Sequence, residues 1–99
     1  MTTEIQYLVS EQNNGFHAIY NGKIVGEITY IRVGIDKLII DYTNVEPEFR
    51  NKHIGLTLVR HVANMARKQK RHVVTLCPFA RAMFNKYSEF DDIRLMHMN

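Results

Sequence analysis

Cysteine, tryptophan and proline are scarce in this chain of 99 residues, which has one cysteine, two prolines and no tryptophan. A single cysteine cannot form a disulfide within the chain, which favours a reducing compartment. No apolar run approaches the roughly 20 residues that a membrane-spanning helix needs. The first residues lack the basic and apolar regions of a secretory signal. We therefore expect a cytoplasmic protein that has no membrane partner.

Several motifs for nucleotides and metals are also missing. The sequence has no Gly-x-x-x-x-Gly-Lys-Ser/Thr loop and no Gly-x-Gly-x-x-Gly fingerprint, which removes the signatures of the P-loop and of the dinucleotide-binding fold. Its five histidines are scattered, with no His-x-x-x-His pair and no His/Cys cluster. Metal ligands usually occur at such short spacings. The sequence therefore predicts no metal site.

Positive charge is in slight excess, with a formal net charge of +3, and much of it lies in Arg67-Lys68-Gln69-Lys70-Arg71-His72. Such a run is typical of a solvated helix end, where cations interact favourably with the helix dipole. It could also form a patch that binds RNA or DNA. No RNP-type aromatic motif, zinc-finger spacing or recognition-helix pattern accompanies it. We therefore favour the helix end over a nucleic-acid partner.

The length fits one domain, residues 1–99, and its first half reads as β-strands. Asn21-Gly22 is a strong hairpin signal, because both residues tolerate the positive φ of a type I′ turn. It predicts strands at 16–20 and 23–31. A short strand is expected at 5–9, and the apolar, β-branched run 37–45 is typical of a central strand.

The second half changes to a helical period. Ile54, Leu58, Val62 and Ala66 recur at the spacing of one helix face. A strand is expected at 72–77, a second helix from Pro78 to about Tyr87, and an optional edge strand at 91–98. The predicted order is β-β-β-β-α-β-α(-β). This is an α/β (α+β) fold with a mixed, mostly antiparallel sheet and two main helices.

The segment between the central strand and the first helix is the best candidate binding site. Backbone N–H groups at a helix start are free to bind an anion, and the helix dipole favours negative charge there. Arg50 and Lys52 add cationic donors, and Gly55 allows a ligand to approach the backbone closely. The alternative is a solvated turn. The residues that we expect around the ligand are Val45, Arg50, Asn51, Lys52, His53, Ile54, Gly55 and Leu56.

The pattern Val-x-Pro-x-x-Arg-x-x-x-x-Gly, which runs from Val45 to Gly55, resembles the pyrophosphate loop of GNAT-type N-acetyltransferases. That loop reads Arg/Gln-x-x-Gly-x-Gly/Ala, so Arg50 and Gly55 match it. His53 stands at the first glycine. Histidine enters the left-handed backbone region more readily than most residues that carry a Cβ, so the loop can retain its shape.

A second stretch, Cys77-Pro-Phe-Ala80-Arg-Ala-Met-Phe84, resembles the Asn-x-x-Ala-x-x-x-Tyr pattern of the same superfamily. Cys77 stands where asparagine is usual, and Phe84 stands where the tyrosine acts as general acid. The resemblance covers residues 5 to 95 and points to a short, single-domain branch. It places Cys77, Phe79 and Phe84 beside the cofactor.

This resemblance implies an N-acetyltransferase-like protein that uses acetyl-CoA and transfers its acetyl group to an amine. The central strand would splay from the strand at 72–77, and its edge amides would pair with the pantetheine arm. A coenzyme A-binding module without turnover is one alternative, and a small basic nucleic-acid-binding protein is another. We expect a monomer or a weak homodimer.

The catalytic groups are less well defined by the sequence. Because Phe84 lacks a hydroxyl, Tyr87 is a candidate general acid. Cys77 is either a nucleophile that takes the acetyl group or a small buried residue. Asp41 and Glu46 are rival general bases. A buried Asp41 would have a raised pKa, whereas an Asp41 on the open side of the sheet would face solvent.

Overall fold

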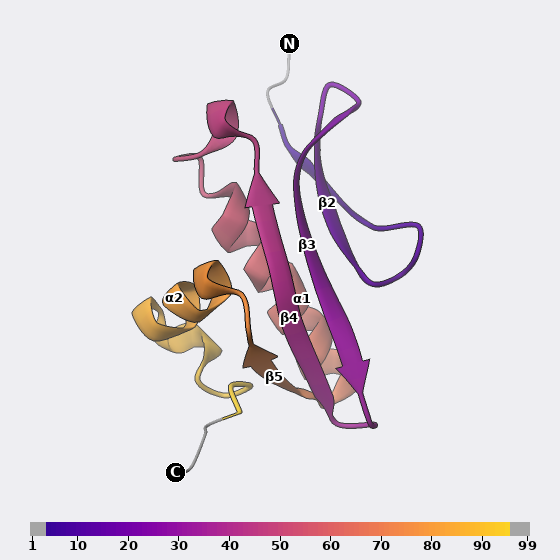
Figure 1. Ribbon diagram of the computed structural model, residues 1–99, viewed down its shortest axis with the longest axis vertical. Coiled ribbons are helices and arrows are strands. Elements are labelled where there is room, and N and C mark those ends of the chain that lie inside the picture. Colours follow the sequence, from indigo (N-terminus) through magenta and orange to yellow (C-terminus); the bar gives the residue numbers. More distant parts are fainter. Residues whose placement is uncertain (1–3, 96–99) are drawn as a thin grey trace.

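The computed structural model describes residues 4–95 (Figure 1). The elements in chain order are β1 (Gln6–Val9), β2 (Gly15–Tyr20), β3 (Lys23–Val33), β4 (Lys37–Val45), α1 (Ile54–Gln69), β5 (His72–Thr75) and α2 (Pro78–Lys86). Short 3-10 helices at Pro47–Phe49 and Ser88–Phe90 complete this part of the chain. None of the helices formed by residues 4–95 is long and apolar enough to cross a membrane.

The five strands form one sheet in the order β1-β2-β3-β4-β5. The first four strands are antiparallel, and β5 joins β4 in parallel. Asn21 and Gly22 have φ angles of 51° and 77°, so the predicted turn joins β2 to β3. The order and class that the sequence predicts are therefore confirmed as far as α2.

Helix α1 buries one apolar face against the sheet. Its core positions repeat every four residues, at Ile54, Leu58, Val62 and Ala66, and each is at most 1% exposed. They share one core with Ile28, Leu38 and Ile40 of the sheet. The helix ends at Gln69, and the left-handed backbone of the cap residue Lys70 (φ 58°) lets its N–H bond back to the last turn.

The optional strand at 91–98 does not form within the described residues, which end at 95. The chain makes a 3-10 turn at Ser88–Phe90, and Arg94 forms only an isolated parallel bridge with Val73. Phe90 and Ile93 are both buried, so this segment does not alternate between two faces as a strand would. Residues 96–98 of the predicted strand lie outside the described part of the chain.

A β-bulge at Asp41 separates the first half of β4, which pairs with β5, from the second half, which does not. Tyr30 pairs with Ile40 and Thr29 pairs with Tyr42, so Asp41 is an extra residue on β4. Pairing between β4 and β5 ends at Ile40 and Thr75. The next two N–H groups of the β5 chain both bond to the Ile40 carbonyl, and the chain then turns into α2. Strand β5 is thus two residues shorter than predicted, and β4 extends beyond it (Figure 1).

The two arginines of the basic run at the end of α1 make internal contacts. Arg67 forms an ion pair with Asp92, with 2.8 Å between Nε and Oδ2. The Arg71 guanidinium donates to the backbone carbonyls of Gly34 and Lys37. Both arginines therefore join neighbouring segments at the end of the helix.

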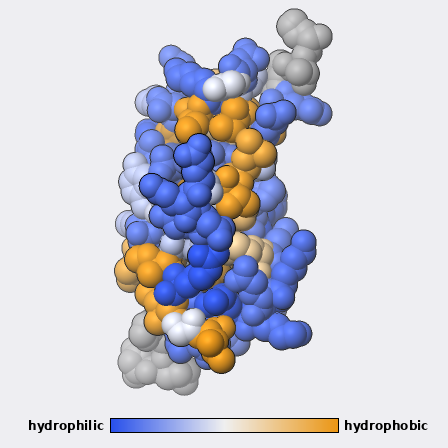
Figure 2. Space-filling model, turned by 90° about the vertical axis from the view of Figure 1, so that its right-hand side faces the viewer, coloured by the Kyte–Doolittle hydropathy of each residue, from blue (hydrophilic) through white to orange (hydrophobic). Residues whose placement is uncertain are grey.

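On the side of the molecule shown in Figure 2, hydrophobic residues are interspersed among hydrophilic ones.

Candidate functional site

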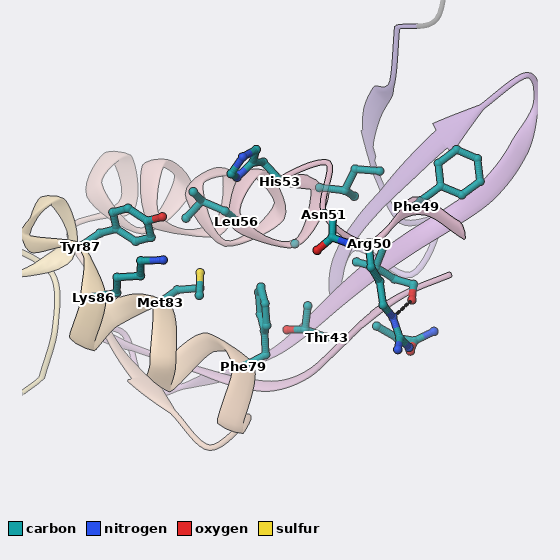
Figure 3. Close-up of a pocket in the computed structure, with 14 residues that line it drawn as sticks. Thr43, Phe49, Arg50, Asn51, His53, Leu56, Phe79, Met83, Lys86 and Tyr87 are labelled. Atoms are coloured by element: carbon teal, nitrogen blue, oxygen red, sulfur yellow. Dashed lines mark hydrogen bonds between the residues drawn. The ribbon is translucent and has the colours of Figure 1, made fainter. Parts of the chain in front are cut away.

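A pocket of about 520 Å³ lies between the end of β4, the start of α1 and one face of α2 (Figure 3). Nine of the residues singled out in the sequence line it: Val45, Arg50, Asn51, His53, Ile54, Gly55, Leu56, Phe79 and Tyr87. The sequence reasoning missed five others, Thr43, Asn44, Phe49, Met83 and Lys86. The predicted loop and the second helix therefore meet at one cavity.

The start of α1 offers unpaired N–H groups to this cavity. His53 is its N-cap residue, with left-handed backbone angles (φ 60°, ψ 20°), and no side chain caps the helix. The N–H of Thr57 makes the first helical bond, to the His53 carbonyl. The N–H groups of Ile54, Gly55 and Leu56 come before it and have no acceptor within the helix. Histidine therefore adopts the backbone conformation for which the family pattern uses glycine.

Gly55 is in contact with an aromatic ring from α2. A Cβ added to Gly55 would come 2.6 Å from Cζ and 2.8 Å from Cε2 of Phe79. The sequence predicted that the missing Cβ makes room for a ligand. In the structure, that room is taken up by Phe79, whose side chain stands in the pocket beside the start of α1 (Figure 3).

Arg50 lies where the open edge of β4 meets the loop. Its Nε donates to the Val45 carbonyl at 2.9 Å, so that carbonyl points away from β3. The N–H of Glu46 points the other way and donates to Val25 on β3. Because backbone groups alternate in direction along a strand, Thr43 and Val45 present theirs to the open edge. Lys52 is exposed and does not line the pocket.

Cys77 lies next to this open edge but is covered. Its side chain is 5% exposed, and Sγ donates to Oγ1 of Thr43 at 3.4 Å. Thr43 lines the pocket, whereas Cys77 does not. The thiol is therefore separated from the cavity by its immediate neighbours, and Thr43 is its only hydrogen-bond partner among the described residues.

Phe84 does not lie where the sequence comparison placed it. It is 1% exposed, and its ring stacks on Phe90 with 4.8 Å between the ring centroids. It does not line the pocket. The 3-10 turn after α2 brings Phe90 against this side chain, so Phe84 belongs to the core and is not a contact for a ligand in this pocket.

The candidate acids and bases are also dispersed. Asp41 and Glu46 are exposed and do not line the pocket. Asp41 accepts a hydrogen bond of 2.7 Å from Oγ1 of Thr29. Tyr87 lines the pocket but follows the last residue of α2, whereas Cys77 precedes the first. The ten steps along the chain from Cys77 to Tyr87 span roughly 15 Å, which is too far for Tyr87 to protonate a group bound near Cys77.

The missed residues of α2 follow a simple pattern. Counted from Phe79, which the sequence had already singled out, Met83 is four positions further along and Lys86 is seven. Tyr87, eight positions from Phe79, follows the helix directly. These spacings place the four side chains on one face. That face borders the pocket, and the adjacent face buries Ala80 and Phe84. The periodicity of α2 could therefore have identified Met83 and Lys86. Thr43 and Asn44 depend on the bulge at Asp41, which has no local sequence signal.

No group of three histidine, cysteine, aspartate or glutamate residues within 4–95 is placed to hold a metal ion. The cations that line the pocket are Arg50 and Lys86, with His53 beside them. An anionic ligand therefore fits this cavity better than a cationic one.

Comparison with solved structures places this geometry among N-acetyltransferases. A Staphylococcus aureus protein described as a GCN5-like N-acetyltransferase aligns over 100% of this chain and 95% of its own, with 28% identity and a TM-score of 0.76. A GNAT family acetyltransferase from Elizabethkingia anophelis, solved with acetyl-CoA bound, shares 20% identity over 80% of this chain, with a TM-score of 0.61. An aminoglycoside 6'-N-acetyltransferase complexed with coenzyme A shares 22% identity over 62%, with a TM-score of 0.57.

The chain spans 54% of the Elizabethkingia protein and 35% of the aminoglycoside enzyme, so these two likenesses concern the fold alone. A comparison with curated protein sequences returned no match. The model of the GCN5-related N-acetyl-transferase family matches residues 15–93, which include the whole pocket. The chain therefore belongs to the family of GCN5-related N-acetyltransferases.

Proposed function

We propose that this protein binds acetyl-CoA in the pocket between β4, α1 and α2 and transfers the acetyl group to an amine. The observation that carries the proposal is the opening between β4 and β5, which lies beside an uncapped helix start in a member of this family. Structural neighbours solved with coenzyme A or acetyl-CoA support it, among them the aminoglycoside enzyme and the Elizabethkingia protein.

The phosphates of the cofactor fit the start of α1. The N–H groups of Ile54, Gly55 and Leu56 supply donors without acceptors in the helix, and the dipole favours an anion. Arg50 is exposed and uses only Nε for its bond to Val45. Its two terminal nitrogens remain available for a phosphate oxygen.

The pantetheine arm fits the open edge of β4. Its amides can pair with the backbone groups of Thr43 and Val45 as an added strand would. The arm then leads towards Thr43 and the neighbouring Cys77. In this arrangement the thioester carbonyl lies where the two strands diverge, and an amine can reach it from the exposed face of the sheet.

The chemical step joins the amine nitrogen to the acetyl carbon and breaks the bond between that carbon and sulfur. The neutral amine gives up one proton to solvent. Coenzyme A leaves as a thiolate, which departs without a general acid and then takes up a proton from solvent. Direct transfer fits the structure better than transfer through Cys77, because the thiol is covered and bonds only to a hydroxyl.

A coenzyme A-binding role without turnover is the second candidate. It is favoured by the positions of Asp41 and Glu46, which are exposed and lie outside the pocket lining. A turnover assay with acetyl-CoA and a panel of primary amines distinguishes the two. Acetylated amine together with released coenzyme A supports the enzyme, and binding without either product supports the module.

The binding site itself is tested by calorimetric titration of acetyl-CoA into the parent, Arg50→Ala and Lys68→Ala. Lys68 is exposed on the last turn of α1, so Lys68→Ala removes the same positive charge at a position far from the pocket. Arg50→Ala should weaken binding by about 1.5–3 kcal/mol, as for a lost charge-assisted hydrogen bond. Lys68→Ala should bind like the parent. Equal affinities for all three proteins would remove Arg50 from the site.

A further inference from the structure

Lys86 places a second cation at the far end of the pocket from the loop. It occupies the last position of α2, and in Figure 3 its side chain extends into the pocket between Met83 and Tyr87. Its Nζ lies 5.4 Å from the centroid of the Tyr87 ring. No carboxylate among residues 4–95 forms an ion pair with it. The ammonium group is therefore available to an anionic ligand.

The position of Lys86 relative to the start of α1 defines two separate sites for negative charge. Phe79 and Lys86 are seven residues apart on one face of α2, which corresponds to roughly 10 Å along the helix. The ring of Phe79 touches Gly55, so the first anion site lies at that end of α2. Because the long Lys86 side chain can reach back along this face, a ligand that used both sites would carry two anionic groups on one compact unit.

The wall between the two sites is mainly apolar. Leu56 contributes from α1, and Met83 and the ring of Tyr87 contribute from α2. Such a surface suits a flat heterocycle, because sulfur and aromatic side chains make favourable contacts with π-systems. The pocket thus combines an anion site, an apolar wall and a second anion site.

Coenzyme A carries these three groups on one ribose: a diphosphate on C5′, a phosphomonoester on C3′, and on C1′ an adenine ring that can lie against the apolar wall. We propose that Lys86 binds the 3′-phosphate and makes the protein prefer coenzyme A over 3′-dephospho-coenzyme A. This inference rests on the proposed function, and it adds a residue that determines which cofactor is accepted. A Lys86 that only stabilised the C-terminal end of α2 through the helix dipole would not distinguish the two ligands.

Calorimetric titrations of coenzyme A and 3′-dephospho-coenzyme A into the parent, Lys86→Met and Lys68→Met test the inference. Methionine keeps the aliphatic stem of Lys86 and removes its charge, and Lys68→Met makes the same change in net charge far from the pocket. The parent should bind coenzyme A about 10–100-fold more tightly than 3′-dephospho-coenzyme A, which corresponds to one charge-assisted contact. In Lys86→Met the ratio should fall below about threefold through loss of this contact, with the affinity for the dephospho form unchanged. Lys68→Met should keep the parent ratio.

The outcomes separate this inference from the proposed function. If the parent binds both ligands equally, or if Lys86→Met keeps the parent ratio, the role of Lys86 is wrong while the binding of coenzyme A stands. If the folded parent binds neither ligand, both proposals fail. Circular dichroism melts of the three proteins confirm that each variant is folded before its affinities are compared.

Discussion

The ring of Phe79 lies so close to Gly55 that a Cβ on the glycine would come 2.6 Å from the ring. An alanine at position 55 would therefore force the Phe79 ring to move. A phosphate that approached the Gly55 amide would share this space with Phe79 or displace it. Phe79 is 38% exposed and belongs to the first turn of α2, so its ring can turn outward at the cost of its contact with the start of α1.

This contact predicts strong coupling between substitutions at the two positions. Gly55→Ala alone should lower the free energy of unfolding by about 1–3 kcal/mol, because the added methyl group overpacks the junction. In a Phe79→Ala background the same change should be neutral or stabilising by up to about 1 kcal/mol, because alanine favours a helix over glycine. Urea unfolding of the four proteins gives the coupling energy. The same cost in both backgrounds would show that the ring does not restrict residue 55.

The left-handed backbone at His53 gives a second prediction. A β-branched residue at φ 60° is strained, so His53→Val should destabilise the fold by about 1–2 kcal/mol. His53→Gly relieves the strain but gives the unfolded chain more freedom, so its stability should stay within about 1 kcal/mol of the parent. His53→Gly should also bind acetyl-CoA within about twofold of the parent, because glycine allows close approach of the backbone to a phosphate. Equal thermal stability of the valine and glycine variants would contradict this account of the loop.

The fold was predictable from the sequence where the signals are local. Asn21-Gly22 determines one turn, and the four-residue spacing from Ile54 to Ala66 determines the longest helix, because each pattern encodes its own backbone geometry. The exact bounds of β4 followed from an apolar run between turn residues. The optional edge strand at 91–98 does not form within the described residues, because Phe90 and Ile93 pack into the core instead of alternating between faces.

The site was predictable only in part for the same reason. Arg50 and Gly55 follow from the family pattern and line the pocket. Phe84 also fits a pattern, yet its ring turns to Phe90, a contact that depends on the path of the chain after α2. The bulge at Asp41 likewise depends on pairing with β3. Such tertiary contacts leave no periodic trace in the sequence.

His61 predicts how stability depends on pH. It stacks on Tyr7 with 5.0 Å between ring centroids and lies 5.4 Å from the Phe16 ring, and burial lowers its pKa below the usual 6.5. In the unfolded chain His61 binds a proton near its ordinary pKa of about 6.5. Around and below that pH the unfolded state therefore binds more protons than the folded state. The free energy of unfolding should fall as the pH falls from 7 towards the lower pKa of the folded state.

The variant His61→Gln isolates this contribution from that of the other histidines. Its free energy of unfolding should change less between pH 7.5 and 5.5 than that of the parent, and the difference between the two proteins should shrink as the pH falls. Chemical denaturation at several pH values measures both curves. Parallel curves would show that His61 titrates alike in the folded and unfolded states.

Cys77 distinguishes direct transfer from a covalent route. Because the thiol is buried and bonds to Thr43, Cys77→Ala should cost about 1 kcal/mol of stability and keep turnover within a few-fold. Mass spectrometry of the parent with acetyl-CoA should show no acetyl group on Cys77. Loss of turnover in Cys77→Ser at unchanged cofactor affinity, together with an acetylated thiol in the parent, would establish the covalent route instead.

The most direct test of the account is an amide NMR titration of the parent with acetyl-CoA, because it shows both whether the cofactor binds and where. The account predicts saturable shifts for the amides of Gly55 and Leu56, for Thr43 on the open edge of β4, and for Lys86. Amides at the opposite end of the molecule, such as that of Gly34, should not move. A spectrum without shifts at saturating acetyl-CoA, or with shifts confined to the Gly34 end, would contradict it.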